Sequence, residues 1–160
     1  MAVKGYKELI DQLNMMMRSD RIMLATLSSV LAGHKKRIFQ NGQDANLGQI
    51  GTYSTKPISI ARKNQSRQTG KTYFRGGYKE YKSLIGKGSD KVNLRNTDQM
   101  QMDYGLKVIK RNEYGFGFTN QFNFDKSNWA EEKYNKEIFG ESSEDAAIFE
   151  RVFNYEISKI

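Results

Sequence analysis

The chain has 160 residues, enough for one domain, and carries a formal net charge of +8. It has no cysteine, which excludes disulfides, thiolate metal sites and cysteine nucleophiles. The charged segment 1–13 is unlike a signal peptide, and no apolar run approaches the roughly 20 residues of a membrane span. We therefore expect a soluble protein without membrane contact, forming a single domain over residues 1–160.

Charge is distributed unevenly along the chain. Residues 56–95 contain 11 basic and 2 acidic side chains, a net charge of +9, whereas residues 125–160 contain 5 basic and 9 acidic, a net charge of −4. A basic middle followed by an acidic section suits contact with nucleic acid, or head-to-tail contact between copies of the chain.

The first predicted element is helical and spans residues 5–37, as one long helix or two consecutive ones. Apolar residues recur there at spacings of three and four, which is typical of one buried stripe. These residues are Tyr6, Leu9, Ile10, Leu13, Met16, Met17, Met23, Leu24, Leu27, Val30 and Leu31. Gly42 is the expected C-terminal stop.

Residues 42–77 lose this periodicity, and we predict a long basic loop there. Within it, the alternation of Ile58 and Ile60 after Pro57 favours a short edge strand. A loop of this length without structure of its own is usually functional or disordered until bound. The next segment, 78–85, predicts a short helix closed by glycine.

A β-hairpin is predicted where apolar residues alternate on both sides of the polar turn RNE. The alternating residues are Tyr104, Leu106 and Val108 before the turn and Tyr114, Phe116 and Phe118 after it. Gly115 and Gly117 lie on the opposite face of the second strand. Because those glycines leave one face without side chains, a helix or a neighbouring subunit is expected to pack closely there.

Two C-terminal helices complete the prediction. Ser127 is the expected cap of one, which would run to Gly140. Ser142 and Asp145 resemble a capping box for the last helix. The predicted fold class is α+β: the long N-terminal helix and the C-terminal helices pack on a small antiparallel β-sheet, with a long basic loop.

Catalytic and metal-binding motifs fail at specific positions. The lone His34 has no ligand-spaced partner, so a helix C-terminal cation or a packed imidazole is the better interpretation. TGKT, ending at Thr72, lacks the glycine of a phosphate loop because position 65 is Gln65. DANLG, from Asp44, fails as a calcium loop because its twelfth position is Thr55. We expect a protein that is not an enzyme and uses no cofactor or metal.

The basic middle is the strongest candidate for an interaction site. Its basic side chains are interleaved with aromatic ones, as on surfaces that bind single-stranded nucleic acid. The candidate residues are Lys63, Arg67, Lys71, Arg75, Lys79 and Lys82, among Tyr73, Phe74, Tyr78 and Tyr81. The alternative is contact with an acidic protein surface, which the acidic section of the same chain could supply. Protein contact is favoured, because no helix-turn-helix, RRM or OB signature accompanies the charge.

Three stretches occur in a characteristic order: RIFQNGQDANLGQIGTYS (Arg37–Ser54), GKTYFRGGYKEYKSLIGKGSDKVNL (Gly70–Leu94) and NLRNTDQMQMDYGLKV (Asn93–Val108). Together they resemble the virion-morphogenesis proteins of phages, a family of tail-completion, neck and head–tail connector proteins. The chain departs from the family pattern at Asp98, where glycine is common, so we expect a different turn there.

The resemblance implies a structural virion protein of the bacteriophage head–tail junction, made in the host cytoplasm. Such a subunit would form a homo-oligomeric ring around the DNA channel, between the capsid portal and the tail. Its implied partners are copies of itself, adjacent portal or head-completion proteins, tail proteins and, non-specifically, genomic DNA in the channel. A basic nucleic-acid-binding protein is the alternative function.

Overall fold

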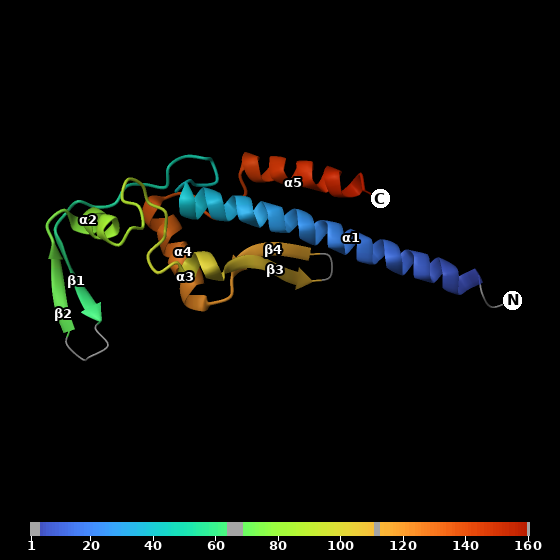
Figure 1. Cartoon of the computed structure of the whole chain (residues 1–160), viewed down its shortest axis with the longest axis horizontal. Helices are drawn as coiled ribbons and strands as arrows, with labels where there is room; N and C mark the ends of the chain where they lie inside the picture. The colour runs from blue at the N-terminus through green and yellow to red at the C-terminus, as the bar shows by residue number, and fades with distance from the viewer. Residues whose placement is uncertain (1–3, 64–68, 111–112, 160) are drawn as a thin grey trace.

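The computed structural model describes residues 4–63, 69–110 and 113–159 and has an α+β fold (Figure 1). Its elements, in chain order, are α1 (Lys4–Lys35), the π-helical turn η1 (Lys36–Gln40), β1 (Ile58–Lys63), β2 (Thr69–Phe74), α2 (Gly77–Leu84), α3 (Gln99–Asp103), β3 (Tyr104–Lys110), β4 (Glu113–Phe118), α4 (Gln121–Tyr134) and α5 (Ser143–Ile157). The strands form two separate antiparallel pairs, β1–β2 and β3–β4.

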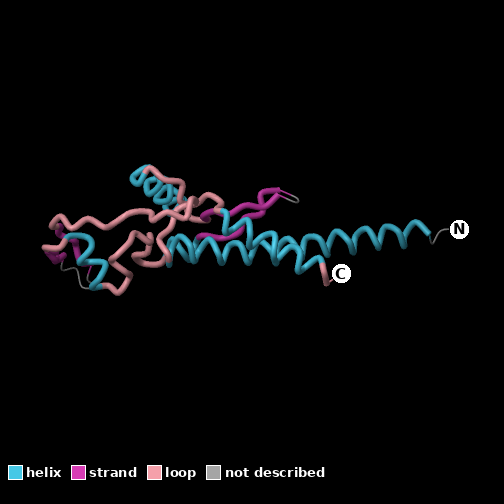
Figure 2. The backbone as a smooth tube through the Cα atoms, turned by 90° about the horizontal axis from the view of Figure 1, so that it is seen from above, coloured by secondary structure: helices cyan, strands magenta, loops and turns pink. Residues whose placement is uncertain are grey.

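Helix α1 is the long axis of an elongated molecule (Figures 1 and 2). Its C-terminal half lies between α5 and the β3–β4 hairpin, whereas its N-terminal half extends beyond them. Helical structure continues through η1, and Gly42 then adopts a φ of +63°, which confirms the predicted stop. A side chain at position 42 would collide with the Val92 carbonyl oxygen, so the stop also requires glycine sterically.

Helix α5 runs antiparallel to α1 and packs closely against it. The approach depends on Gly33, where a Cβ atom would lie 2.7 Å from the Cδ1 of Ile148. The predicted capping box at the start of α5 is confirmed: the Ser142 hydroxyl accepts from the Asp145 amide, and the Asp145 carboxylate accepts from the Ser142 amide. The capping box fixes where α5 begins, and Gly33 allows its close approach to α1.

The predicted β3–β4 hairpin is confirmed, with Tyr104 opposite Phe118 and Leu106 opposite Phe116. This hairpin supplies aromatic rings to the core, which lies where α1, η1 and the β3–β4 hairpin meet the segments around residues 50, 92 and 138. The fully or nearly buried members of this core are Ile38, Phe39, Ile50, Val92, Met100, Tyr104 and Ile138.

The prediction of one long loop over 42–77 is wrong for β1 and β2, which pair as a second hairpin. Ile58 lies opposite Phe74 and Ile60 opposite Thr72, so the short strand predicted from the two isoleucines does form. The polar strand β2 was missed because its outward residues are basic and polar, which period-2 alternation of apolar residues cannot reveal. The short helix predicted over 78–85 is confirmed as α2.

The boundaries predicted for α4 are wrong. The helix begins after Asn120, whose side chain accepts from the Phe122 amide at 2.9 Å, and ends at Tyr134, where Asn135 adopts a φ of +49°. Ser127 lies inside the helix, where its hydroxyl donates to the Phe124 carbonyl instead of capping. In the described ranges 4–63, 69–110 and 113–159, no helix is both long and apolar enough to cross a bilayer.

Candidate binding groove

The predicted basic residues do not form one site. Lys71 and Arg75 are exposed, on β2 and just after it, and Lys79 is exposed on α2. The side chains of Lys63 and Arg67 lie outside the described residues. Of the four that are described, Lys79 alone lines the groove that lies between residues 52–56, α2 and α4.

The prediction that Lys82 contacts DNA or a partner is wrong, because its side chain is completely buried. Its ammonium donates to the Asn93 Oδ1 at 3.3 Å and to the Arg95 carbonyl, and it lies 5.0 Å from the centre of the Tyr53 ring. Burial lowers the pKa of Lys82 to about 8. Lys82 thus holds α2 against the segment 93–95 from inside the protein.

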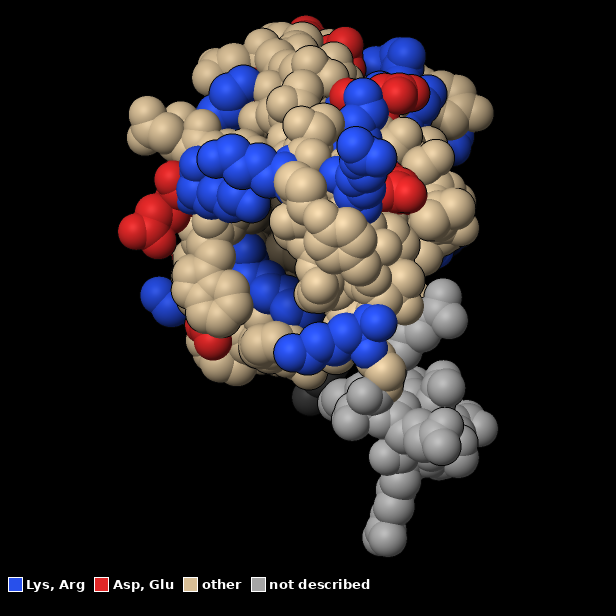
Figure 3. Space-filling model, turned by 90° about the vertical axis from the view of Figure 1, so that its left-hand side faces the viewer, with Lys and Arg blue, Asp and Glu red and all other residues tan. Residues whose placement is uncertain are grey.

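A groove of about 810 Å³ lies between four segments: residues 52–56, α2, residues 89–96 and α4. Its lining is rich in two kinds of side chain, basic and aromatic. The basic residues are Lys56, Lys79, Arg95, Lys126 and Lys133, and the aromatic residues are Tyr53, Tyr78, Trp129 and Tyr134. Seen from the end that carries α2, basic side chains gather around a hollow in the surface (Figure 3).

The geometry of the groove depends on tight contact between α2 and the 54–56 segment. Gly77 begins α2 with a φ of +71°, and a Cβ atom there would lie 2.4 Å from the Lys56 carbonyl oxygen. The Lys79 amide donates to the Ser54 carbonyl at 3.0 Å. The opposite wall is tied down by Tyr53, whose hydroxyl donates to the Asn93 Oδ1 at 3.0 Å.

Four lysines of the groove carry uncompensated charge. Lys56, Lys79, Lys126 and Lys133 form no ion pair with any carboxylate in the part of the chain that the structure describes. Arg95 is different, since its Nε donates to the Asp98 carboxylate at 2.8 Å. The lining contains a single acidic residue, Asp90. The groove is therefore a site of positive potential with aromatic walls.

Asp98 closes the turn that leads into α3 and positions Arg95. Hydrogen bonds from Arg95 and Lys87 lower the pKa of the Asp98 carboxyl to about 2. The backbone at Asp98 has a φ of +60°, the left-handed conformation that favours glycine.

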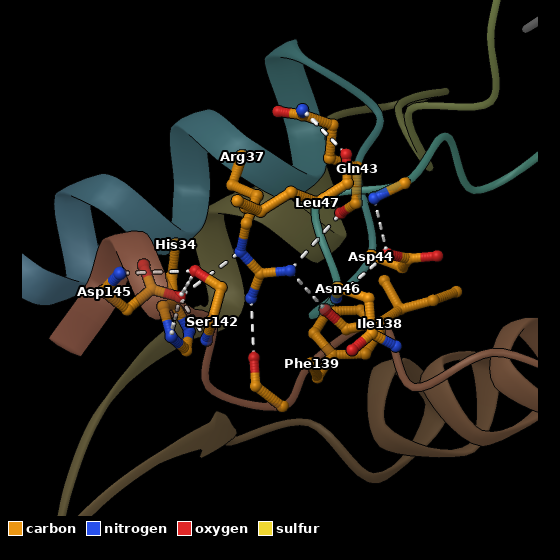
Figure 4. Close-up of polar contacts among 12 residues, drawn as sticks. His34, Arg37, Gln43, Asp44, Asn46, Leu47, Ile138, Phe139, Ser142 and Asp145 are labelled. Atoms are coloured by element: carbon orange, nitrogen blue, oxygen red, sulfur yellow. Dashed lines mark hydrogen bonds and ion pairs between the residues drawn. The ribbon is translucent and has the colours of Figure 1, made fainter.

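A second polar cluster is buried between α1, η1, β3 and α5 (Figure 4). The His34 Nδ1 lies 3.0 Å from the Tyr104 hydroxyl, and its Nε2 lies 3.0 Å from the Asp145 carboxylate. The Arg37 Nε lies 3.3 Å from the same carboxylate, which also accepts from the Ser142 hydroxyl at 2.6 Å. The packed-imidazole interpretation of His34 is confirmed, since the side chain is almost fully buried.

Burial sets the chemistry of this cluster. It lowers the pKa of His34, against the attraction of Asp145, so the imidazole is neutral at pH 7. Burial likewise raises the pKa of the Tyr104 hydroxyl far above its ordinary value. Arg37 also donates to the carbonyls of Ile138, at 3.1 Å, and Gly140, at 2.6 Å. These contacts join α1 and η1 to residues 138–140 and to the start of α5.

Sequence reasoning missed both the groove and the buried cluster, because each joins residues distant in sequence. One local pattern in the sequence could have indicated the groove: Lys126, Trp129 and Lys133 have the spacing of one helix face.

Asp44, considered for a calcium loop, accepts from the amides of Asn46 and Gly48, and its carboxylate pairs with Lys136 at 3.1 Å. Among the described residues, no three histidine or acidic side chains converge as they would around a metal ion.

The chain matches no protein-family model, and no curated protein or solved structure is significantly similar to it.

Proposed function

We propose that the chain is a structural subunit of a protein assembly, the ring of a phage head–tail junction that joins the capsid portal to the tail. The observation that carries the assembly role is an excess of surface. The chain exposes 11,604 Å², whereas a folded monomer of its 18.5 kDa mass exposes about 8,200 Å² on average. A surplus on the order of 3,000 Å² is in the range that obligate interfaces bury.

The projecting half of α1 offers a surface for such an interface. A helix of 32 residues is about 48 Å long, and its N-terminal half extends beyond both α5 and the β3–β4 hairpin (Figure 2). Met15 and Met17, in this half, are each 64% exposed. Because a helix gains most of its stability from packing, a projecting apolar helix is stabilised by a partner.

Charge separation supports a ring with heterologous contacts. The groove gathers lysines at one end of the molecule, whereas α5, with the exposed Glu144 and Glu150, lies alongside α1. In a closed ring, different surfaces of one chain meet, and opposite charge favours that pairing.

The assignment to a phage neck rests on the resemblance of Arg37–Ser54, Gly70–Leu94 and Asn93–Val108 to virion-morphogenesis proteins. One structural observation supports it. The different turn expected at Asp98 is not found: Asp98, where the family pattern has glycine, adopts the positive φ that favours glycine.

Analytical ultracentrifugation and electron microscopy of the purified chain test the assembly role. We expect closed oligomers that increase with concentration, and we expect Met15→Glu combined with Met17→Glu to dissociate them. Met102→Glu, at a methionine of α3 that is 79% exposed, is the control and should leave them intact. A monomer at every concentration, alone and with portal or tail proteins, contradicts the proposal. Absence of the chain from immunogold-labelled virions contradicts the phage neck specifically.

A further inference from the structure

We infer that the groove between residues 52–56, α2 and α4 binds a single-stranded nucleic acid, with phosphates on its lysines and a base on Trp129. The inference goes beyond the assembly role and does not depend on it.

The positive charge of the groove calls for an anionic ligand. Lys56, Lys79, Lys126 and Lys133 converge from three separate segments of the chain, and none is neutralised by a carboxylate that the structure describes. Bringing four ammonium groups together costs free energy through mutual repulsion, which a polyanion relieves. Lysine is a point-charge donor well suited to phosphate oxygens.

The aromatic side chains decide between polyanions. Lys126, Trp129 and Lys133 share one face of α4 and line the same wall of the groove. The Lys126 ammonium lies 4.2 Å from the centre of the Phe122 ring, and the Lys133 ammonium 5.3 Å from that of Tyr134, so both cations stand among aromatic rings. Trp129 is 57% exposed, although the apolar surface of a tryptophan is usually covered. Cations beside an open ring are what single-stranded binding surfaces use, because every base offers a face for stacking.

The floor of the groove repeats the combination of rings and charge. Tyr53 and Tyr78 lie with ring centres 5.4 Å apart and line the groove together with Lys56 and Lys79. An acidic peptide satisfies the lysines, but the carboxylates that pair with them offer no ring face to Trp129. A duplex hides its base faces. A cavity of about 810 Å³ is also of the size that encloses small-molecule ligands. A short stretch of single strand therefore fits the groove best.

Trp129 is the only tryptophan of the chain, so its fluorescence reports on the groove directly. The experiment titrates the full chain with oligothymidylate at several salt concentrations. We expect quenching of Trp129 and a log–log salt slope of about −3 if the four free lysines each neutralise a phosphate.

The decisive variant is Lys56→Gln, Lys79→Gln and Lys133→Gln together. It should weaken binding about tenfold or more at low salt and bring the slope to about −0.7. The matched control, Lys36→Gln, Lys110→Gln and Lys159→Gln, removes the same charge from exposed lysines outside the groove and should keep both affinity and slope. Trp129→Ala, followed by anisotropy of a labelled oligonucleotide, should weaken binding on the order of tenfold.

Three results would overturn the inference. The first is equal loss of affinity in the groove variant and its control, which means diffuse charge attraction. The second is equal quenching by duplex DNA. The third is displacement of the oligonucleotide by polyglutamate at equal charge concentration, which assigns the groove to an acidic protein segment. Failure of this test leaves the assembly proposal standing, because ultracentrifugation of the free chain measures that separately.

Discussion

The two hairpins of this protein have nearly the same length but different surroundings. Tyr104, at the start of β3, is 1% exposed and packs with Phe118 and Phe139. In β1–β2 a single described residue, Phe74, is buried, against the ring of Tyr81 on α2. Figure 1 shows β3–β4 alongside α1, whereas β1–β2 projects at the far end.

The difference shows that strand pairing alone does not place a hairpin in the core. A two-stranded hairpin is marginally stable in water, and packing against a helix supplies the rest. β3–β4 obtains that packing from α1 and from the aromatic rings around His34. β1–β2 has α2 as its neighbour, and leaves its polar and basic side chains exposed.

The largest expected effect comes from removing the buried ring of β3. Tyr104→Ala should lower the free energy of unfolding by about 3–5 kcal/mol, because it opens a cavity and removes the hydroxyl that contacts His34. Tyr73→Ala in β2 is the matched control: Tyr73 is 65% exposed, so its loss should cost less than about 0.5 kcal/mol. Urea denaturation measures both. Similar losses in the two hairpins would contradict the comparison.

The same contrast explains how far the fold could be predicted. One face of the β3–β4 hairpin packs on the rest of the protein, so its apolar residues occur at every second position: Tyr104, Leu106, Phe116 and Phe118. This alternation made the hairpin predictable from the sequence. β2 reads TGKTYF, and Phe74 is its one described residue that is buried, so the sequence of this strand carries little record of packing. Local caps, such as Ser142 with Asp145, were predictable because both partners lie within one helical turn.

The second prediction concerns the buried carboxylate that ties α5 to the β3–β4 end. Asp145→Asn keeps the shape but removes the charge that faces Arg37 and His34. An uncompensated guanidinium would then be buried, so we expect a loss on the order of 3 kcal/mol in the free energy of unfolding. Glu144→Gln, in the same turn but exposed, should change it by less than about 0.5 kcal/mol. Equal effects would mean that helix capping charge, and not the buried cluster, stabilises α5.

The site itself was less predictable than the fold, for a reason that these residues make clear. His34 meets Asp145 only after the whole chain has folded, and no spacing in the sequence records that contact. Lys82 was assigned to the surface because lysine is almost never fully buried. Its burial depends on Asn93 and the Arg95 carbonyl, which the turn through residues 86–92 brings into place.

The third prediction addresses this buried lysine at the β1–β2 end. Lys82 has a folded pKa of about 8, below the ordinary value of 10.5, so the unfolded chain binds more protons between those values. Stability should therefore rise from pH 8 to pH 9.5, at up to about 1 kcal/mol per pH unit. Higher pH is avoided because burial raises the pKa values of Tyr53, Tyr78 and Tyr104, whose ionisation in the unfolded chain acts in the opposite direction as the pH approaches 10.

Urea denaturation at pH 7.5, 8.5 and 9.5 measures this rise. Lys82→Met should remove it, whereas Lys79→Met, at an exposed position on the same helix, should retain it. A flat profile in the unmodified chain contradicts the prediction without any variant, so the test survives if Lys82→Met does not fold.

The smallest expected effect is the pH response of His34 at the β3–β4 end, because the attraction of Asp145 offsets part of the cost of burial. The pKa of His34 is lowered, so the unfolded chain binds more protons than the folded chain below its ordinary pKa of about 6.5. The free energy of unfolding is therefore unaffected by His34 above that pH and falls as the pH drops toward the folded pKa.

His34 is the only histidine, and it faces Asp145 on α5, Arg37 on η1 and Tyr104 on β3. Melting temperatures from pH 7.5 to 5.5 should fall in the unmodified chain and less in His34→Gln. A rise on acidification would show that Asp145 outweighs burial and holds a charged imidazole.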